Sequence, residues 1–144
     1  YCAGLFDGEG CVTVGRGRAK HGTTLSVMAR IIMTDRRAMD ILCSHFGGRI
    51  IGPSPSSHPL GKPTYRWQVT GRTAVPVLPA ILPYLHIKAE VVRLGLRLIV
   101  LRPSKRGQRV PEAYLPERTY IANRVYELNH KGTGPLRPVR IPLP

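Results

Sequence analysis

The chain has 144 residues, of which 42% are hydrophobic and 21% are charged, values that indicate one globular domain rather than a disordered or fibrous protein. No apolar run approaches the ~18 residues that a membrane-spanning helix needs, so we expect a soluble protein without a membrane partner. There are 22 Lys and Arg against 8 Asp and Glu, a formal net charge of +14, and this excess predicts a polyanionic partner, most simply nucleic acid.

The cysteines give no sign of a disulfide framework or a zinc site. Cys2, Cys11 and Cys43 are an odd number and lack CxxC spacing, which favours an intracellular, reducing compartment. Cys43 and His45 could form a metal pair, but a buried cysteine beside a surface histidine is the preferred interpretation. No targeting signal is visible, and a start at Tyr1 without Met indicates a trimmed N-terminus.

Residues 2–9 (CAGLFDGE) predict a short helix with an unusual face. Gly4 and Gly8 lie one turn apart with Ala3 beside them, so that another helix backbone could approach closely. A flexible glycine-rich turn is the alternative. Asp7 and Glu9 stand at the end of this helix, where the helix dipole disfavours carboxylates, and their presence there needs an explanation.

Two strands are expected next. Residues 11–14 (CVTV) have strand propensity, and residues 15–22 (GRGRAKHG) indicate a hairpin turn or a mobile loop. Residues 23–32 (TTLSVMARII) alternate between apolar and polar side chains and predict a half-buried strand. Val12, Val14, Arg16 and Arg18 share one parity, which a regular strand could not accommodate on either face, so we expect a bulge.

A helix and two further strands complete the predicted sheet. Thr34 or Asp35 can cap a helix whose inner side is apolar, and Gly47 and Gly48 would end it. Residues 49–52 predict a short strand, residues 53–63 a loop, and residues 64–71 a strand whose outer face is polar and basic. A solvated face and a binding surface both fit such a pattern; the charge of the chain favours binding.

The remaining chain predicts helices. Residues 73–85 are helical but interrupted by Pro83, residues 88–102 form a longer amphipathic helix, and residues 117–130 form the last one. Residues 102–116 form a basic loop. We expect one domain over residues 1–130, followed by a Pro-rich basic tail over residues 131–144 that need not be ordered.

Residues 2–10 (CAGLFDGEG) resemble the nine-residue signature of the LAGLIDADG homing endonucleases, with mild departures at Cys2, Phe6, Gly8 and Glu9. The segments IIMTD, FGGRI, YRWQV, LPYLHIKAEV and ELNHKG follow in the order and spacing of that family. The resemblance implies an α+β fold, an αββαββα core whose four-stranded antiparallel DNA-binding sheet is backed by helices, with further helices at the C-terminus.

The resemblance also implies a function. A chain with one signature would form a homodimer through Ala3, Gly4, Asp7 and Gly8, and would cut a long, near-palindromic double-stranded DNA target, with no small-molecule substrate. The rival interpretations are a catalytically silent DNA-binding protein, an intron RNA maturase of the same fold, or a basic structural protein of the ribosomal type.

Site residues follow from the same resemblance. Glu9 would be the catalytic carboxylate and would bind Mg²⁺ together with the carbonyl group of Gly8, with Mn²⁺ or Ca²⁺ able to substitute in binding. Lys88 and Arg37 would be basic catalytic residues near the scissile phosphate. The DNA-binding residues would be Arg16, Arg18, Lys20, Thr24, Ser26, Met28, Arg30, Arg49, Thr64, Arg66, Gln68 and Thr70.

Overall fold

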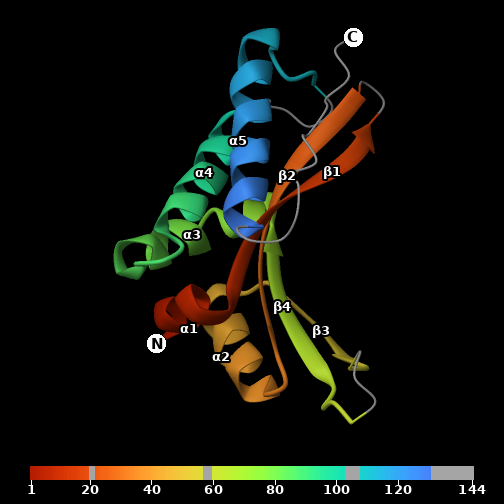
Figure 1. The fold of residues 1–144 in the computed structure, drawn as a ribbon, viewed down its shortest axis with the longest axis vertical. Helices are drawn as coiled ribbons and strands as arrows, with labels where there is room; N and C mark the ends of the chain where they lie inside the picture. Colours follow the sequence, from red (N-terminus) through yellow and green to blue (C-terminus); the bar gives the residue numbers. More distant parts are fainter. Residues whose placement is uncertain (20–21, 57–59, 103–107, 131–144) are drawn as a thin grey trace.

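The structure is a computed structural model that describes residues 1–19, 22–56, 60–102 and 108–130 (Figure 1). Its helices and strands are α1 (Cys2–Glu9), β1 (Gly10–Ala19), β2 (Gly22–Met33), α2 (Arg36–Phe46), β3 (Arg49–Ser54), β4 (Thr64–Thr70), α3 (Val77–Ile81), α4 (Ala89–Val100) and α5 (Leu115–Asn129), with short 3-10 helices η1 (Gly71–Ala74), η2 (Leu82–Tyr84) and η3 (Glu112–Tyr114). The predicted tail, residues 131–144, and Lys20 lie outside the described residues.

The strands form one antiparallel sheet in the order β1-β2-β4-β3, with helices on one of its faces (Figure 1). Alternation places Val27, Ala29 and Ile31 of β2 beneath the helices, each at most 2% exposed, and the neighbouring Trp67 and Val69 of β4 are buried with them. The other face of the sheet carries no helix of the described chain. The predicted α+β fold with an open sheet is therefore confirmed.

The ends of α2 follow the local chemistry of the sequence. Asp35 is the N-cap, and its carboxylate accepts a hydrogen bond from the Arg37 backbone N–H at 2.9 Å. Gly47 follows the last turn with φ of +66°, a conformation that favours glycine, and its carbonyl oxygen accepts a bond from the Trp67 indole N–H at 2.8 Å. The helix is thereby fixed to the centre of the sheet.

Prolines divide the segment after β4 into short pieces, as the sequence predicts, before α4 and α5 pack over β1 and β2. Two surface ion pairs link α4 and the C-terminal helix: Arg97 with Glu117 at 2.6 Å and Arg124 with Glu90 at 2.9 Å. Arg118 of α5 is buried, and its guanidinium donates to the carbonyl oxygen of Leu101 at the end of α4, at 2.6 Å. A cation at that point complements the negative end of the α4 dipole.

The structure corrects two expectations for β1. Residues 15–19 are strand rather than turn or loop, because they continue the pairing with β2, where Gly15 opposes Ser26 and Gly17 opposes Thr24. A side chain at Gly17 would crowd the Thr24 hydroxyl, which lies 2.9 Å from the position of its Cβ. The register has no bulge, so Arg16 keeps the parity of the buried Val12 although it is itself exposed.

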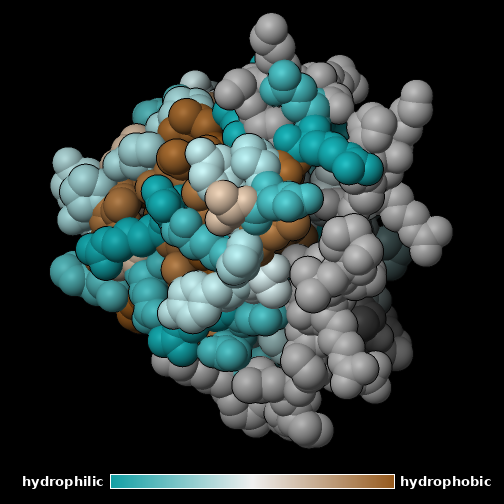
Figure 2. All heavy atoms as spheres, turned by 90° about the horizontal axis from the view of Figure 1, so that it is seen from above, coloured by the Kyte–Doolittle hydropathy of each residue, from teal (hydrophilic) through white to brown (hydrophobic). Residues whose placement is uncertain are grey.

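Figure 2 shows the end of the molecule that lies at the top of Figure 1. Hydrophilic side chains cover most of the described surface in this view, and hydrophobic ones emerge between them. Scattered apolar groups of this kind are ordinary on protein surfaces. Among the described residues, no helix is both long enough and apolar enough to cross a bilayer.

Candidate functional site

The C-terminal end of α1 is the point where the predicted site residues come together. Gly10 turns the chain directly from the helix into β1, and a Cβ at this position would collide with the carbonyl oxygen and ring of Phe6. Only glycine therefore permits so abrupt an exit, and it leaves Glu9 at the edge of the sheet where β1 begins.

Asp7 is turned into the protein. It is 9% exposed, and its carboxylate accepts hydrogen bonds from the backbone N–H groups of His86 at 2.9 Å, Ile87 at 3.0 Å and Lys88 at 2.8 Å. These groups immediately precede α4, where backbone N–H groups lack partners within the helix. The Asp7 carboxylate thus accepts the free N–H groups at the beginning of α4. These bonds compensate for its unfavourable interaction with the dipole of its own helix.

The protonation of Asp7 follows from these bonds. Burial alone would raise its pKa, but the backbone donors of Ile87, His86 and Lys88, together with the charge of Lys88, outweigh burial and hold the pKa below its ordinary value of 3.8. Asp7 is therefore an anion at neutral pH. Its lone pairs are already committed to the protein, which leaves little capacity for an external ligand.

Lys88 is held against the same helix end. Its ammonium group donates to the carbonyl oxygen of Asp7 and, at 2.9 Å, to that of Gly8. These carbonyl groups belong to the last turn of α1, where they accept no hydrogen bond from the helix itself and form the negative end of its dipole. The structure therefore brings Lys88 to the Gly8 carbonyl, although the two residues are 80 positions apart.

Glu9 differs from Asp7 in every respect that matters for ligand binding. It is exposed, and it forms no hydrogen bond or ion pair within the described part of the chain. The neighbouring Gly8 is also exposed. Glu9 thus offers a carboxylate without a described partner, and the adjacent Gly8 carbonyl oxygen, which accepts one bond from Lys88, keeps a second lone pair for a ligand.

These donors fit a hard divalent cation only in part. A carboxylate and a backbone carbonyl are the oxygen ligands that Mg²⁺ accepts, but Mg²⁺ demands six donors. Across residues 1–19, 22–56, 60–102 and 108–130, no three His, Cys, Asp or Glu side chains are grouped so that they could hold a metal ion. The remaining ligands would have to come from beyond the described part of this chain, for example from water, DNA or a partner subunit.

Arg37 is paired at the beginning of α2, and no described contact joins it to the end of α1. Its guanidinium forms a close pair with Asp35, at 2.6 Å between Nη2 and the carboxylate, and this bond raises the pKa of Arg37, with a weaker contribution from Tyr1. Arg37 keeps Nη1 unused by Asp35.

The open face of the sheet holds most of the predicted DNA-binding residues. The strand registers align Arg49 with Gln68, Gln68 with Arg30, and Arg30 with Cys11, so that one row crosses all four strands. The open face also carries, by alternation, Thr24, Ser26, Met28, Thr64, Arg66 and Thr70. The backbone of Arg18 belongs to β1, but its side chain lies outside the described part of the structure.

Sequence reasoning missed two members of this face. Cys11 pairs with Arg30 and Thr13 pairs with Met28, so both β1 side chains point to the open side. The sequence contains the information needed to predict this. Val12 is apolar and should face the core, so Cys11 and Thr13 on either side of it must face the opposite side of a regular strand. Arg16, which the sequence predicts to bind DNA, instead has the parity of the buried Val12.

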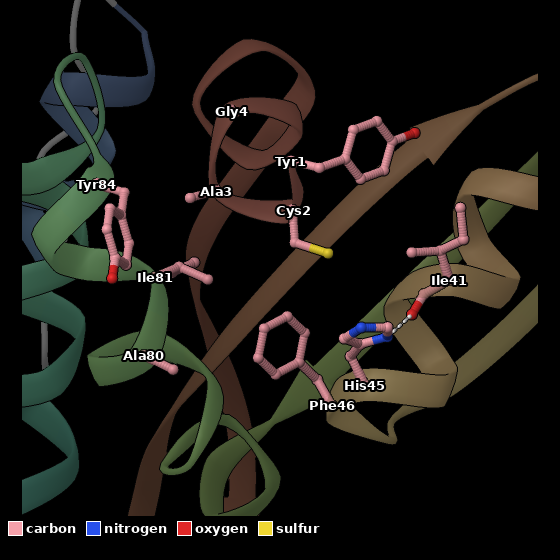
Figure 3. Close-up of a pocket in the computed structure, with 10 residues that line it drawn as sticks. All are labelled: Tyr1, Cys2, Ala3, Gly4, Ile41, His45, Phe46, Ala80, Ile81 and Tyr84. Atoms are coloured by element: carbon pink, nitrogen blue, oxygen red, sulfur yellow. Dashed lines mark hydrogen bonds between the residues drawn. The ribbon is translucent and has the colours of Figure 1, made fainter.

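The outer face of α1 is bare. Ideal Cβ atoms built on Gly4 and Gly8 would meet nothing within 4 Å, so space is open beside both glycines. A hollow of about 580 Å³ lies next to Gly4, between α1, α2 and the segment around η2 (Figure 3). Its lining is mostly apolar and consists of Tyr1, Cys2, Ala3, Gly4, Ile41, His45, Phe46, Ala80, Ile81 and Tyr84.

Comparison with solved structures shows which fold this is. The homing endonuclease I-CvuI, solved in complex with the I-CreI target in the presence of Mg, has a TM-score of 0.71 at 21% identity, over 94% of this chain and 82% of its own. The archaeal intron-encoded homing endonuclease I-Vdi141I, complexed with DNA, has a TM-score of 0.72 at 18% identity, over 98% of this chain and 87% of its own.

A third neighbour relates the chain to larger proteins of the same fold. The LAGLIDADG homing endonuclease I-GzeII, in complex with its DNA target, has a TM-score of 0.67 at 14% identity, over 99% of this chain but only 50% of its own. No model of a known protein family matches the sequence, and no curated protein matches it. The chain therefore has the fold of the LAGLIDADG homing endonucleases, at identities too low to show more than the fold.

Proposed function

We propose that this chain is a site-specific, divalent-metal-dependent endonuclease that cuts double-stranded DNA as a homodimer. The observation that carries the proposal is the end of α1. There, Glu9 is exposed and has no partner among the described residues, and the carbonyl oxygen of the preceding Gly8 accepts a hydrogen bond from the Lys88 ammonium, at the margin of an open sheet face rich in Arg, Gln and Thr. The resemblance of residues 2–10 to the LAGLIDADG signature supports assigning the catalytic role to the same carboxylate.

Glu9 and the Gly8 carbonyl would hold Mg²⁺, with phosphate oxygens of DNA, water and a second Glu9 from the partner subunit completing its ligands. When bound, the ion would supply Lewis-acid stabilisation of the phosphate that is attacked. The structures of I-CvuI that share this fold were solved with Mg or with Ca. Their metals support the choice of a hard divalent cation for the present chain.

Lys88 would contribute positive charge near the phosphate. Its ammonium already lies at the Gly8 carbonyl, and the chain before α4 that carries it is anchored by the Asp7 carboxylate. A cation fixed in this way requires little reorganisation to stabilise developing negative charge. Arg37 is the second basic candidate; it would act through Nη1 or after separating from Asp35.

A homodimer is supported by the open side of α1. Gly4 and Gly8 leave room for a second helix backbone, Ala3 adds a small side chain, and the adjoining hollow would receive apolar side chains of the other subunit. Asp7 would contribute indirectly, by fixing the end of α1. A twofold dimer contacts DNA through equal half-sites, so the target would be near-palindromic.

Base contacts would come from the open face. Arg pairs with guanine and Gln with adenine in the major groove, and Arg30, Arg66 and Gln68 occupy adjacent positions there, with Ser26 further along β2. The same rules make a substitution at one of these residues relax specificity at one position of each half-site.

The decisive experiment separates binding from cleavage with Glu9→Gln. Targets are first selected from a randomised duplex library in Mg²⁺, and cleavage and binding are then measured on the selected site. We expect Glu9→Gln to lower the cleavage rate by orders of magnitude, while binding without divalent metal is unchanged or tighter because a charge facing phosphate has been removed. Glu112→Gln, a change at another exposed carboxylate, is the matched control.

Three outcomes have distinct meanings. Cleavage by Glu9→Gln at close to the wild-type rate would remove the metal assignment. Specific DNA binding by the wild type without any cleavage would identify the silent DNA-binding alternative. Preference for a structured intron RNA over every duplex would identify the maturase.

A further inference from the structure

Two isoleucines stand on the open face of the sheet, where the other described side chains are largely polar. Ile32 on β2 and Ile51 on β3 are both Cα partners of Arg66 on β4, so the three form one row with the arginine at its centre. Directly opposed residues of antiparallel strands share a face, with Cβ atoms about 5 Å apart. Ile32 is 40% exposed, and neither isoleucine belongs to the buried core or packs against it.

The isoleucines flank Arg66 on both sides of β4. Its Nε atom is buried and has no hydrogen-bond partner within the described part of the chain, and its guanidinium forms no ion pair there. The stem of the arginine therefore lies in a row with two branched apolar side chains, and no described acceptor binds its Nε. The outer nitrogens remain available for an acceptor that this part of the protein does not supply.

The row also has a defined place relative to α1. Gly10, the first residue of β1, pairs with Ile31, so the residue before it, Glu9, stands at the level of Ile32. The row Ile32–Arg66–Ile51 is therefore the part of the open face nearest the end of α1. The rows with Gln68 and Thr70 follow at increasing distance along β4.

We propose that Ile32 and Ile51 are specificity-determining residues that contact the C5-methyl groups of thymines flanking a guanine bound by Arg66. The proposal rests on the DNA-binding function proposed above and adds the chemistry of one subsite to it. An isoleucine cannot donate or accept a hydrogen bond, and the thymine methyl is the apolar group that base edges display in the major groove. The subsite would lie in the inner part of each half-site, close to the cleaved phosphates.

The test removes the methyl group without changing base pairing. A DNA site is selected by binding from a randomised duplex library, and each thymine next to the inner guanine is replaced by deoxyuridine. We expect each replacement to weaken binding roughly fourfold, the effect of leaving one methyl group unburied. In Ile32→Ala, thymine and deoxyuridine should bind equally at the position that Ile32 contacts.

Val100→Ala is the matched control, because Val100 is an exposed aliphatic residue of α4 on the helical side of the sheet. This variant should retain the preference for thymine. Specific binding with no loss on deoxyuridine replacement would overturn the inference while leaving the proposed function intact. A preference that survives in Ile32→Ala would overturn the assignment of Ile32, and the absence of any sequence-specific DNA binding would overturn both proposals.

Discussion

Asp7→Asn offers the sharpest test of how α1 and α4 are joined. The substitution keeps the size of the side chain but removes its charge and replaces one acceptor oxygen by an NH₂ donor. The three N–H groups of His86, Ile87 and Lys88 then compete for a single oxygen that can accept at most two of them. At least one N–H of this partly buried cluster must lose its partner.

The expected cost follows from that count. One unsatisfied buried N–H costs about 1–3 kcal/mol, and the surviving bonds change from charge-assisted to neutral, which removes roughly 1 kcal/mol more. We therefore expect Asp7→Asn to lower the free energy of unfolding by about 2–4 kcal/mol. That is a large share of the ~5–15 kcal/mol that stabilises an ordinary domain.

Urea unfolding at pH 7, followed by far-UV circular dichroism, measures the change. Protein concentration has to be held constant, because dimerisation would contribute to the apparent stability. Asp40→Asn is the control, since Asp40 is exposed on α2 and its side chain is 3.6 Å from Arg36 in a surface pair; it should change stability little. A loss below about 0.5 kcal/mol in Asp7→Asn would refute the role assigned to the three bonds.

The pH dependence gives an independent check with a fixed sign. The pKa of folded Asp7 lies below its ordinary value of 3.8, so the stability that its ionised form contributes is complete above that pH. As pH falls through the folded pKa, this contribution is lost. The stability gap between wild type and Asp7→Asn should therefore be constant from pH 7 to about pH 5 and narrow below about pH 4.

Two further predictions concern assembly and DNA. Gly4→Leu should leave the isolated chain folded, because nothing lies within 4 Å of the Cβ position, but it should prevent two α1 helices from meeting. Sedimentation of the DNA complex should then show one bound chain instead of two. An unchanged mass of the complex would place the dimer interface elsewhere. The affinity for DNA should also fall steeply with salt, by ~10³- to 10⁵-fold between 50 and 200 mM if six to ten phosphates are contacted. Binding titrations at several salt concentrations measure the slope of log affinity against log salt concentration. A flat slope would exclude a surface that contacts phosphates.

The sequence was sufficient wherever local pattern and tertiary environment agreed. Alternation in residues 23–32 predicted both faces of β2, because the strand is covered on one side only. The cap at Asp35 and the stop at Gly47 and Gly48 were predictable for the same reason, since each depends on neighbouring residues and on backbone conformation alone.

The prediction of a turn or loop at residues 15–19 was wrong because these residues pair with β2 despite their composition. Residues 15–19 have the glycines and charges of a loop, yet β2 continues opposite them and supplies a complete ladder of backbone partners. Glycine is poor in an isolated strand, but it is favourable where the partner carries a hydroxyl that needs room, as Thr24 does beside Gly17. Nothing within residues 15–19 carries that information.

The relation between Asp7 and Lys88 could not have been derived from either segment, because the contacts join residues about 80 positions apart. A carboxylate at the end of a helix is locally unfavourable, and the sequence shows only the penalty. The compensating donors are the N–H groups that precede α4, and they become visible only once the fold brings that helix to the end of α1.

The two carboxylates at the end of α1 differ in the partners that surround them. Asp7 has three donors and the adjacent charge of Lys88, so its negative charge is neutralised within the chain. Glu9 has no described partner, although the chain has a large excess of cations with which a free carboxylate could have paired. An uncompensated anion beside a helix C-terminus is stabilised when a cation binds there. Under the proposed function, Asp7 has a structural role and Glu9 a ligand-binding role, so loss of Asp7 should weaken the fold while loss of Glu9 should spare it.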